Sequence, residues 1–213
     1  MTHFRPETFA FLRELAAHND RDWFGANKAR YERYVKGVFA AFVVALAPRL
    51  AAVDPDARCD AKSLFRIHRD TRFSADKSPY KTHAGAHFPC GERGVHRPGW
   101  YLHVQPGQCF LGAGLWHPEP PTLARIRAAI HAQQPRWAEV KAAIPPMTGE
   151  SLTRVPRGYD KDHPFADDLR RKDHTTGVTY DEAALCDPGF LDRFVGDCGR
   201  VRPLVRFLGD AVG

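Results

Sequence analysis

The stretch FRIHRDTRFSADKSPYKTH, residues 65–83, holds the residues of this chain whose types and spacing could do chemistry. Arginine presents forked N–H donors that match phosphate and carboxylate oxygens, and lysine adds positive charge. If residues 65–72 are extended, alternate side chains project from one face, and a turn near residues 78–79 brings the next residues back toward them. We therefore predict an anion-binding site. The predicted ligand-binding residues are Arg66, Arg69, Asp70, Arg72, Lys77, Tyr80 and Lys81.

In this prediction the arginines and lysines hold the anion, and Tyr80 orients it through a hydrogen bond. Asp70 positions an arginine or, if it lies close to the ligand, acts as a base. A purely structural role is the alternative, because Asp70 and Asp76 can neutralise two of the arginines. The residue types do not decide between a site and a salt-bridge network.

Three functions are compatible with such a stretch. We favour an enzyme or binding protein for a small anionic ligand, such as a phosphate ester, a nucleotide or a carboxylate metabolite. Nucleic-acid binding is an alternative, although the sequence has no RNP-type motif, zinc finger or clear helix-turn-helix pattern. An interaction domain that docks an acidic partner protein is another. No motif indicates a particular cofactor or reaction.

Other constellations give weaker signals. Ser74 and Lys77 form an S-x-x-K pair, but the Ser-Asp-Asn and Lys-Thr-Gly motifs that accompany it in penicillin-binding enzymes are missing. The 11 histidines include no His-Glu-x-x-His pattern, and we predict no metal site. The 5 cysteines are an odd number at irregular spacing, which indicates free thiols rather than disulfides.

Hydrophobic periodicity predicts the elements that must position the basic stretch. Apolar residues at helical spacing predict a helix that begins at Pro6 and a second one over residues 31–47, stopped or kinked by Pro48. Residues 100–116 predict two strands joined by a turn at residues 106–107, and residues 175–180 predict an edge strand.

Later helices are predicted from residue 121 with a kink at Pro135, from Pro164, and as two patterns that separate at Pro203. In the strand that contains Phe110, two glycines at residues 112 and 114 share a face and leave a shallow groove. A packed helix is favoured over a ligand as the occupant of this groove.

Size and composition favour one soluble domain. The chain has 213 residues, 43% of them hydrophobic and 11% aromatic, which is enough to form a substantial core. The net charge of +6 suits an anionic partner. No secretory signal precedes residue 12, and the longest apolar run, residues 38–47, is about half of a membrane span. We predict a single α+β domain over residues 1–213, a mostly antiparallel sheet flanked by helices, located in the cytoplasm with no membrane partner.

The segment RIHRDTRFSADKSPY resembles the signature of an uncharacterised bacterial and fungal family, the domain of unknown function 2461 family. Its shared pattern falls on Arg66, Arg69, Asp70, Arg72, Phe73, Lys77 and Tyr80. The segments NDRDWFGANKARYE, YLHVQPGQCFLGAGLWHPEP and GYDKDHP also resemble that family, so the likeness covers nearly the whole chain. His68 stands where many members have Tyr, which argues against a catalytic role for it. The resemblance implies no established activity.

Overall fold

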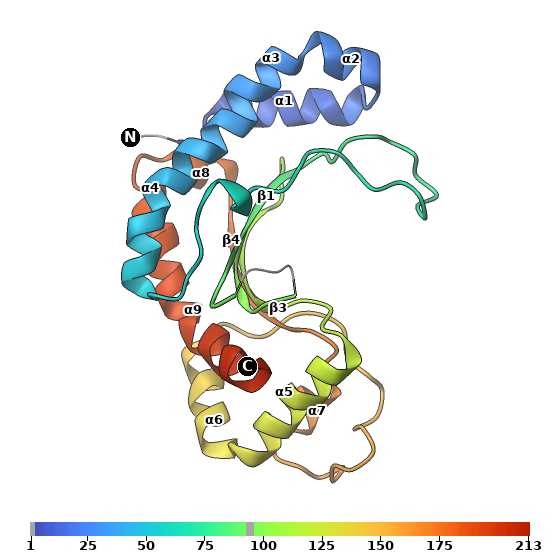
Figure 1. The fold of residues 1–213 in the computed structure, drawn as a ribbon, viewed down its shortest axis with the longest axis vertical. Coiled ribbons are helices and arrows are strands. Elements are labelled where there is room, and N and C mark those ends of the chain that lie inside the picture. The colour runs from blue at the N-terminus through green and yellow to red at the C-terminus, as the bar shows by residue number, and fades with distance from the viewer. Residues whose placement is uncertain (1–2, 93–95) are drawn as a thin grey trace.

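A four-stranded antiparallel sheet lies at the centre of the computed structural model, which describes residues 3–92 and 96–213 (Figure 1). The strands pair in chain order, as β1 (Ala84–Pro89), β2 (Gly99–Val104), β3 (Cys109–Leu115) and β4 (His174–Tyr180). The predicted hairpin is confirmed, because β2 pairs with β3 and Gly107 turns the chain with a φ of +74°. The predicted edge strand is confirmed as β4.

The N-terminal quarter of the chain is helical. Its elements are α1 (Pro6–Ala17), α2 (Arg21–Ala26), α3 (Lys28–Tyr31), the π-helical turn η1 (Glu32–Lys36), α4 (Gly37–Val53) and the 3-10 turn η2 (Ala61–Ser63). The prediction of a helix from Pro6 is confirmed. Pro48, however, does not stop α4. The carbonyl that Pro48 deprives of a donor belongs to Val44, which is 75% exposed, so water can satisfy it.

The remaining helices follow the hairpin and β4. They are α5 (Pro120–Ala132), α6 (Gln134–Ala143), α7 (Ala166–Arg170), α8 (Glu182–Cys186) and α9 (Phe190–Val212). The prediction of one kinked helix through Pro135 is wrong, because the chain breaks at Gln133 and α6 begins there. The prediction of two terminal helices is also wrong. Pro203 lies inside α9, and the residue four positions before it is the exposed Gly199, so water can reach the carbonyl left without a donor.

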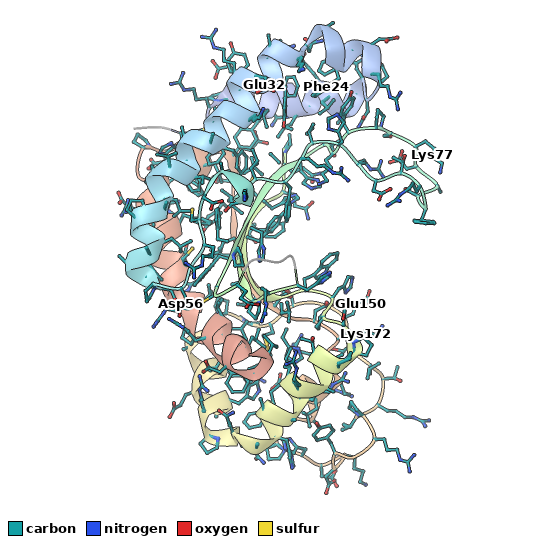
Figure 2. All side chains as sticks on the ribbon, in the orientation of Figure 1. Phe24, Glu32, Asp56, Lys77, Glu150 and Lys172 are labelled. Atoms are coloured by element: carbon teal, nitrogen blue, oxygen red, sulfur yellow. The ribbon has the colours of Figure 1, made fainter. Side chains whose placement is uncertain are left out.

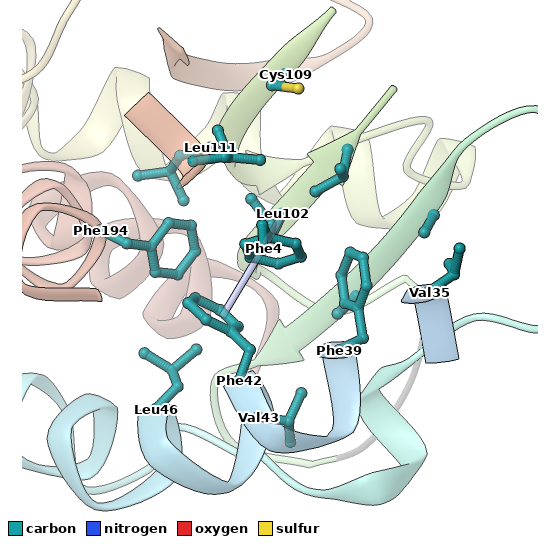
Figure 3. Packing of buried hydrophobic residues seen from close by; sticks show 14 of the residues in the cluster. Phe4, Val35, Phe39, Phe42, Val43, Leu46, Leu102, Cys109, Leu111 and Phe194 are labelled. Atoms are coloured by element: carbon teal, nitrogen blue, oxygen red, sulfur yellow. The ribbon is translucent and has the colours of Figure 1, made fainter. Parts of the chain in front are cut away.

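Helices α4 and α9 cover one face of the sheet and form the main core with it (Figure 3). Phe42 of α4 and Phe194 of α9 pack edge to face, with ring centroids 5.6 Å apart. The indole N–H of Trp100 on β2 donates to the carbonyl of Cys198 on α9 at 3.0 Å, so this buried polar group is satisfied. The sheet is thus fixed to α9 by both packing and hydrogen bonding.

A second apolar cluster lies beyond the end of β3, where α5, α6 and α7 meet the C-terminal half of α9. Its buried members are Leu115, Ile126, Ile130, Trp137, Val140, Leu169, Leu204, Phe207, Leu208 and Val212. Because α9 contributes side chains to both clusters, it joins the two ends of the molecule. The predicted class is confirmed: the chain is an α+β domain with an antiparallel sheet and flanking helices.

One helical segment, residues 28–53, is long and apolar enough to cross a membrane by length and composition. Its apolar residues serve the core instead. Phe39, Phe42, Leu46 and Leu50 of α4 are all fully buried against the sheet and α9. The segment therefore behaves as the core helix of a globular domain.

The second face of the sheet turns toward the hollow of a crescent-shaped molecule (Figure 1). This face carries Phe110 and Gly112 of β3 and Tyr101 of β2, which alternate with the core residues of the same strands. The expectation that a helix packs on the glycine face is not met, because α4 and α9 lie on the opposite face. The nearest atoms to a Cβ atom at Gly112 would be those of the Phe110 ring at 3.5 Å and of Tyr101 at 3.8 Å, which are ordinary contact distances.

Candidate functional site

Residues 64–82 form a long hairpin-like arm that extends from the start of β1 (Figures 1 and 2). We call it the basic arm. Its base is held by isolated bridges rather than by a continuous strand, and one of them joins His68 to Tyr80. The Arg69 N–H donates to the carbonyl of Pro79, and the Lys81 N–H donates to the carbonyl of Ile67. Beyond this ladder the chain makes a wide loop over residues 70–78.

Tyr80 fixes the base of the basic arm to α2 and to the turn before it. The Tyr80 ring is only 6% exposed and stacks on Phe24 with ring centroids 4.0 Å apart. The Tyr80 backbone exchanges two hydrogen bonds with the side-chain amide of Asn19, at 3.0 and 3.1 Å. These contacts hold the arm at a set distance from α2.

Arg69 crosslinks the two sides of the basic arm. Its guanidinium forms an ion pair with Asp76 and donates to the hydroxyl of Ser74 at 3.3 Å. Hydrogen bonds lower the pKa of Asp76 to about 2, and those from Ser78 contribute more than the one from Arg69. Asp76 is therefore ionised at neutral pH. Arg69 keeps part of its surface exposed, with 25% of its side-chain area accessible.

Arg72 pairs with Asp70 at the far end of the arm, with 2.6 Å between guanidinium nitrogen and carboxylate oxygen. The hydrogen bonds from the Arg72 side chain and backbone lower the pKa of Asp70 to about 2. A carboxylate with so low a pKa is a weak base at neutral pH. In this structure Asp70 pairs with Arg72, and its role in a ligand site stays a prediction.

The two lysines of the arm bind backbone carbonyls. The Lys77 ammonium donates to the carbonyl of Thr71 at 3.0 Å. The Lys81 ammonium donates to the carbonyl of Arg66 at 3.1 Å and lies 5.4 Å from the centre of the Phe65 ring. The side chain of Arg66 is exposed. Lys77 and Lys81 thus order the loop through hydrogen bonds to backbone carbonyls, and neither forms an ion pair with a carboxylate of the described residues.

A cleft of about 1030 Å³ separates the basic arm from α2 and the turn that precedes it. Three of the predicted residues line it: Arg69, Lys77 and Tyr80. The other predicted residues, Arg66, Asp70, Arg72 and Lys81, lie outside its lining. The remaining lining residues are Asn19, Asp20, Arg21, Asp22, His68, Thr71, Ser78 and Pro79.

Eight of the lining residues were not among the predicted site residues, and Asn19, Arg21 and His68 are three of them. Two sequence signals fall on this wall of the cleft: residues 18–20 are typical of a helix cap, and the segment NDRDWFGANKARYE, which begins at Asn19, resembles the family. Asp20 has that role, because its carboxylate accepts from the backbone N–H of Trp23 at 2.8 Å. Arg21 follows at the first position of α2 and is exposed beside the cleft.

The charges that line the cleft come from both walls. Arg69 and Lys77 project from the arm, and Arg21 projects from α2. Asp20 and Asp22 supply negative charge, but the Asp20 carboxylate is engaged at the N-terminus of α2. The arrangement can hold a small anion between an ammonium and two guanidinium groups, with the hydroxyl of Thr71 as a further donor. The hydroxyl of Ser78 donates to Asp76 instead.

No group of three or more metal-ligating side chains occurs in residues 3–92 and 96–213. All five cysteines are free thiols, as expected from their spacing. Burial raises the pKa of Cys59 to about 12 and that of Cys90 to about 11, so neither is a thiolate at neutral pH.

Comparison with known proteins places the chain in one family. Residues 7–207 match the model of a family described as conserved hypothetical protein, DUF2461. A search of curated proteins found no match, and a search of solved structures found none either. The match spans almost the whole chain, in agreement with the resemblance seen in the sequence. The protein therefore belongs to the DUF2461 family.

Proposed function

We propose that the cleft between the basic arm and α2 binds a small anionic ligand that carries a phosphate or carboxylate group. One observation carries the proposal: Arg69 and Lys77 of the arm line the same cleft as Arg21 of α2. Guanidinium and ammonium groups on opposite walls can contact different oxygens of one anion. We further propose a cytoplasmic location, since five free thiols suit a reducing compartment.

The ion pair between Arg69 and Asp76 does not prevent this role. The Asp76 side chain is 60% exposed, and pairs of this kind contribute only about 0–1 kcal/mol to stability. Arg69 also has more N–H donors than its contacts with Asp76 and Ser74 require. An anion can therefore bind to Arg69 beside Asp76 or in its place, at a small cost in free energy.

The experiment that tests the proposal is a thermal-shift screen at low salt. The probes are inorganic phosphate, pyrophosphate, nucleotides, phosphorylated sugars and di- and tricarboxylates. A ligand present at 100 times its Kd stabilises the folded state by about 2.7 kcal/mol, which is a clear rise in Tm. Hits are then titrated by calorimetry.

Variants locate the binding site. We expect Lys77→Ala and Arg21→Ala each to weaken the affinity of a hit by about 10-fold or more, because each removes a hydrogen bond to a charged group. Arg66→Ala is the matched control, since Arg66 belongs to the same arm but lies outside the cleft lining. The proposal fails if no probe binds, or if Arg66→Ala weakens binding as much as Lys77→Ala. Equal losses together with a steep salt dependence indicate a nucleic acid instead.

A second candidate function is protein interaction through the tip of the arm. Phe73 is 96% exposed there, and the Arg72 guanidinium lies 5.8 Å from the centre of its ring. Exposed aromatic and arginine side chains are common anchors in protein interfaces.

A photo-crosslinking amino acid at position 73 tests this candidate in cells. We expect it to capture one partner protein that the same amino acid at position 44 does not capture. Val44 is the matched control, because it is also exposed, at 75%, but lies on α4. Identical crosslinking patterns from the two positions would reject the arm as an interaction site.

A further inference from the structure

The face of the sheet that turns toward the hollow has an unusual composition. We call it the open face. The four strands of the described sheet contain no Lys, Arg, Asp or Glu at any position, so the open face carries no charged strand residue. An uncovered sheet face in a water-soluble domain normally alternates apolar with charged or polar residues. An uncharged and partly aromatic surface with a few polar groups is instead typical of a ligand site.

Two side chains of β2 and that of Gln105, just beyond its end, form a hydrogen-bonded row along the open face. The hydroxyl of Tyr101 lies 3.0 Å from Nδ1 of His103, and Nε2 of His103 lies 3.1 Å from the side-chain oxygen of Gln105. Because the amide oxygen accepts, Nε2 carries the imidazole proton and Nδ1 accepts from the phenol. The phenol proton is thus committed to His103. The phenol oxygen keeps lone pairs that can accept a hydrogen bond from a ligand.

Gly85 on the neighbouring strand makes this row possible. A Cβ atom at Gly85 would lie 2.3 Å from the Tyr101 hydroxyl oxygen, far inside van der Waals contact. Glycine therefore allows the Tyr101 side chain to lie over β1 instead of standing upright. The Tyr101 ring becomes one wall of the open face.

Two histidines border this wall and have free ring nitrogens. Within the described residues, no hydrogen bond involves the imidazole of His83 or His87. Burial lowers the pKa of each to about 4, so both are neutral at physiological pH. A neutral imidazole offers one N–H donor and one acceptor nitrogen. The strand side chains of the open face therefore offer both donors and acceptors without a charge. The nearest charge is the Lys81 ammonium at the edge of the face, which contributes to the lowered pKa of His83.

Aromatic rings and a bare stretch of backbone complete the surface. The His103 ring stacks on Phe110 with centroids 4.7 Å apart and an interplanar angle of 14°, and His83 lies 4.5 Å from His103. Next to Phe110, Gly112 of β3 pairs with Gly177 of β4, so two adjacent strands lack a side chain at the same level. A flat ring can approach the backbone there while its edge reaches Tyr101 and the histidines.

We propose that the open face binds an uncharged, planar nitrogen heteroaromatic ring of the nucleobase type. The aromatic walls favour a flat π-system over a saturated molecule. The mixed donors and acceptors of His83, His87 and Tyr101 favour a ring with both N–H groups and ring nitrogens. The absence of charged strand residues favours a neutral ligand. This site is separate from the anion cleft, whose lining includes none of these residues.

The test is a titration of the full-length protein with free adenine, guanine and cytosine, followed by NMR of the histidine side chains. Naphthalene sulfonate and inorganic phosphate serve as the aromatic and anionic comparison probes. We expect at least one free base to shift the resonances of His83 and His87, and phosphate to leave them in place. No shift with any base overturns the proposal. A stronger response to naphthalene sulfonate than to every base also overturns it.

Substitutions on the open face give the second readout. Gly112→Leu fills the bare stretch, and we expect the affinity for the base to fall at least 10-fold. Its φ is not in the left-handed region and its nearest neighbours are at ordinary contact distance, so the fold tolerates the change. The matched control is Gly199→Leu on the exposed side of α9, which leaves binding unchanged.

Tyr101→Phe is a second variant, and unlike Gly112→Leu it adds no atoms that could block the site. It keeps the ring and removes the acceptor oxygen, and we expect a smaller loss of affinity with an unchanged fold. Arg69→Ala separates this site from the anion cleft, because it leaves the binding of a free base intact. If Gly112→Leu binds the base as well as the wild type, or if Arg69→Ala abolishes its binding, the open face is not the site.

Discussion

Asp54 is a fully buried carboxylate that two arginines of α9 neutralise. Its Oδ2 atom lies 2.9 Å from Nε of Arg202 and 2.5 Å from Nε of Arg206. Burial alone would raise the pKa of Asp54, but the hydrogen bonds from Arg202 and the Asp56 backbone and the charge of Arg206 outweigh it and lower the pKa. The segment after α4 is therefore joined to α9 by a charge that depends on pH.

We expect Asp54→Asn to destabilise the fold by about 2–3 kcal/mol at pH 7. Breaking a buried pair costs about 3–5 kcal/mol, and the partial exposure of both arginines reduces this figure. Because the folded-state pKa is lowered, the pair stabilises the fold above the unfolded value near 4, and this stabilisation is lost as the pH falls through the folded value. Urea unfolding at pH 7 and at pH 3 measures the free energy of unfolding of the wild type and of Asp54→Asn. The difference between the two proteins should be smaller at pH 3 than at pH 7.

Asp210→Asn is the control for this measurement. Asp210 also pairs with an arginine, Arg136, but both side chains are about half exposed. We expect a change below about 1 kcal/mol at either pH. An Asp54→Asn effect as small as that of Asp210→Asn would contradict the buried role of Asp54.

At the scale of single residues, the sequence identified the charged residues of the basic arm but did not predict which of them form ion pairs with one another. Asp70 and Asp76 do neutralise arginines, which was the structural alternative. The pairing of Arg69 with Asp76 depends on a loop whose path the residue types do not specify. The presence of Arg21 in the cleft was not predicted, because Arg21 is 48 positions before Arg69 in the chain. The contacts of Tyr80 with Phe24 and Asn19 bring the two walls together.

At the scale of elements, two glycines of β3 have different roles. Gly114 has a φ of +116°, and a Cβ atom there would lie 2.0 Å from the carbonyl oxygen of His174 on β4. Gly112 has no such constraint. The first glycine allows β3 and β4 to pair, whereas the second leaves space on the open face.

We expect Gly114→Ala to destabilise the fold by at least about 2 kcal/mol, because the substitution adds both a clash and an unfavourable backbone conformation. Gly112→Ala should change the free energy of unfolding by less than about 1 kcal/mol. Guanidinium unfolding of the two variants measures both values. Equal costs would show that the pairing of β3 with β4 does not depend on Gly114.

Local sequence patterns correctly predicted the helices and strands whose ends are set by neighbouring residues in the chain. The helix from Pro6, the hairpin around Gly107 and the strand β4 follow from spacing and turn residues alone. The predictions failed where tertiary packing overrides a local rule. Pro48 and Pro203 lie within helices because buried residues on the turns that follow, such as Leu50 and Leu204, hold those turns against the core. The uncovered glycine face was also missed, since the sequence does not show on which side the helices pack.

At the scale of the whole molecule, α9 carries buried residues of both apolar clusters. Phe194 belongs to the cluster with α4 and the sheet, and Phe207 belongs to the cluster with α5 and α6. Because one continuous helix contributes to both clusters, unfolding of either cluster destabilises the other. The single domain predicted over residues 1–213 thus implies one cooperative unfolding transition.

We expect Phe194→Ala and Ile130→Ala to lower the Tm of one and the same transition. Both side chains are fully buried, and such truncations cost about 2–5 kcal/mol. Calorimetry with fluorescence and circular dichroism in parallel checks whether the transitions coincide. Two separate transitions, each lowered by only one of the substitutions, would show that the clusters unfold independently.

The uncharged strands and the ion-paired arm respond to solvent in opposite ways. Added salt screens exposed pairs such as those of Arg72 and Arg69, whereas the sheet contains no charge to screen. Ionic strength should therefore loosen the arm and leave the sheet unchanged. The protein thus combines a sheet that is insensitive to salt with a short arm, residues 64–82, whose conformation depends on the ionic strength.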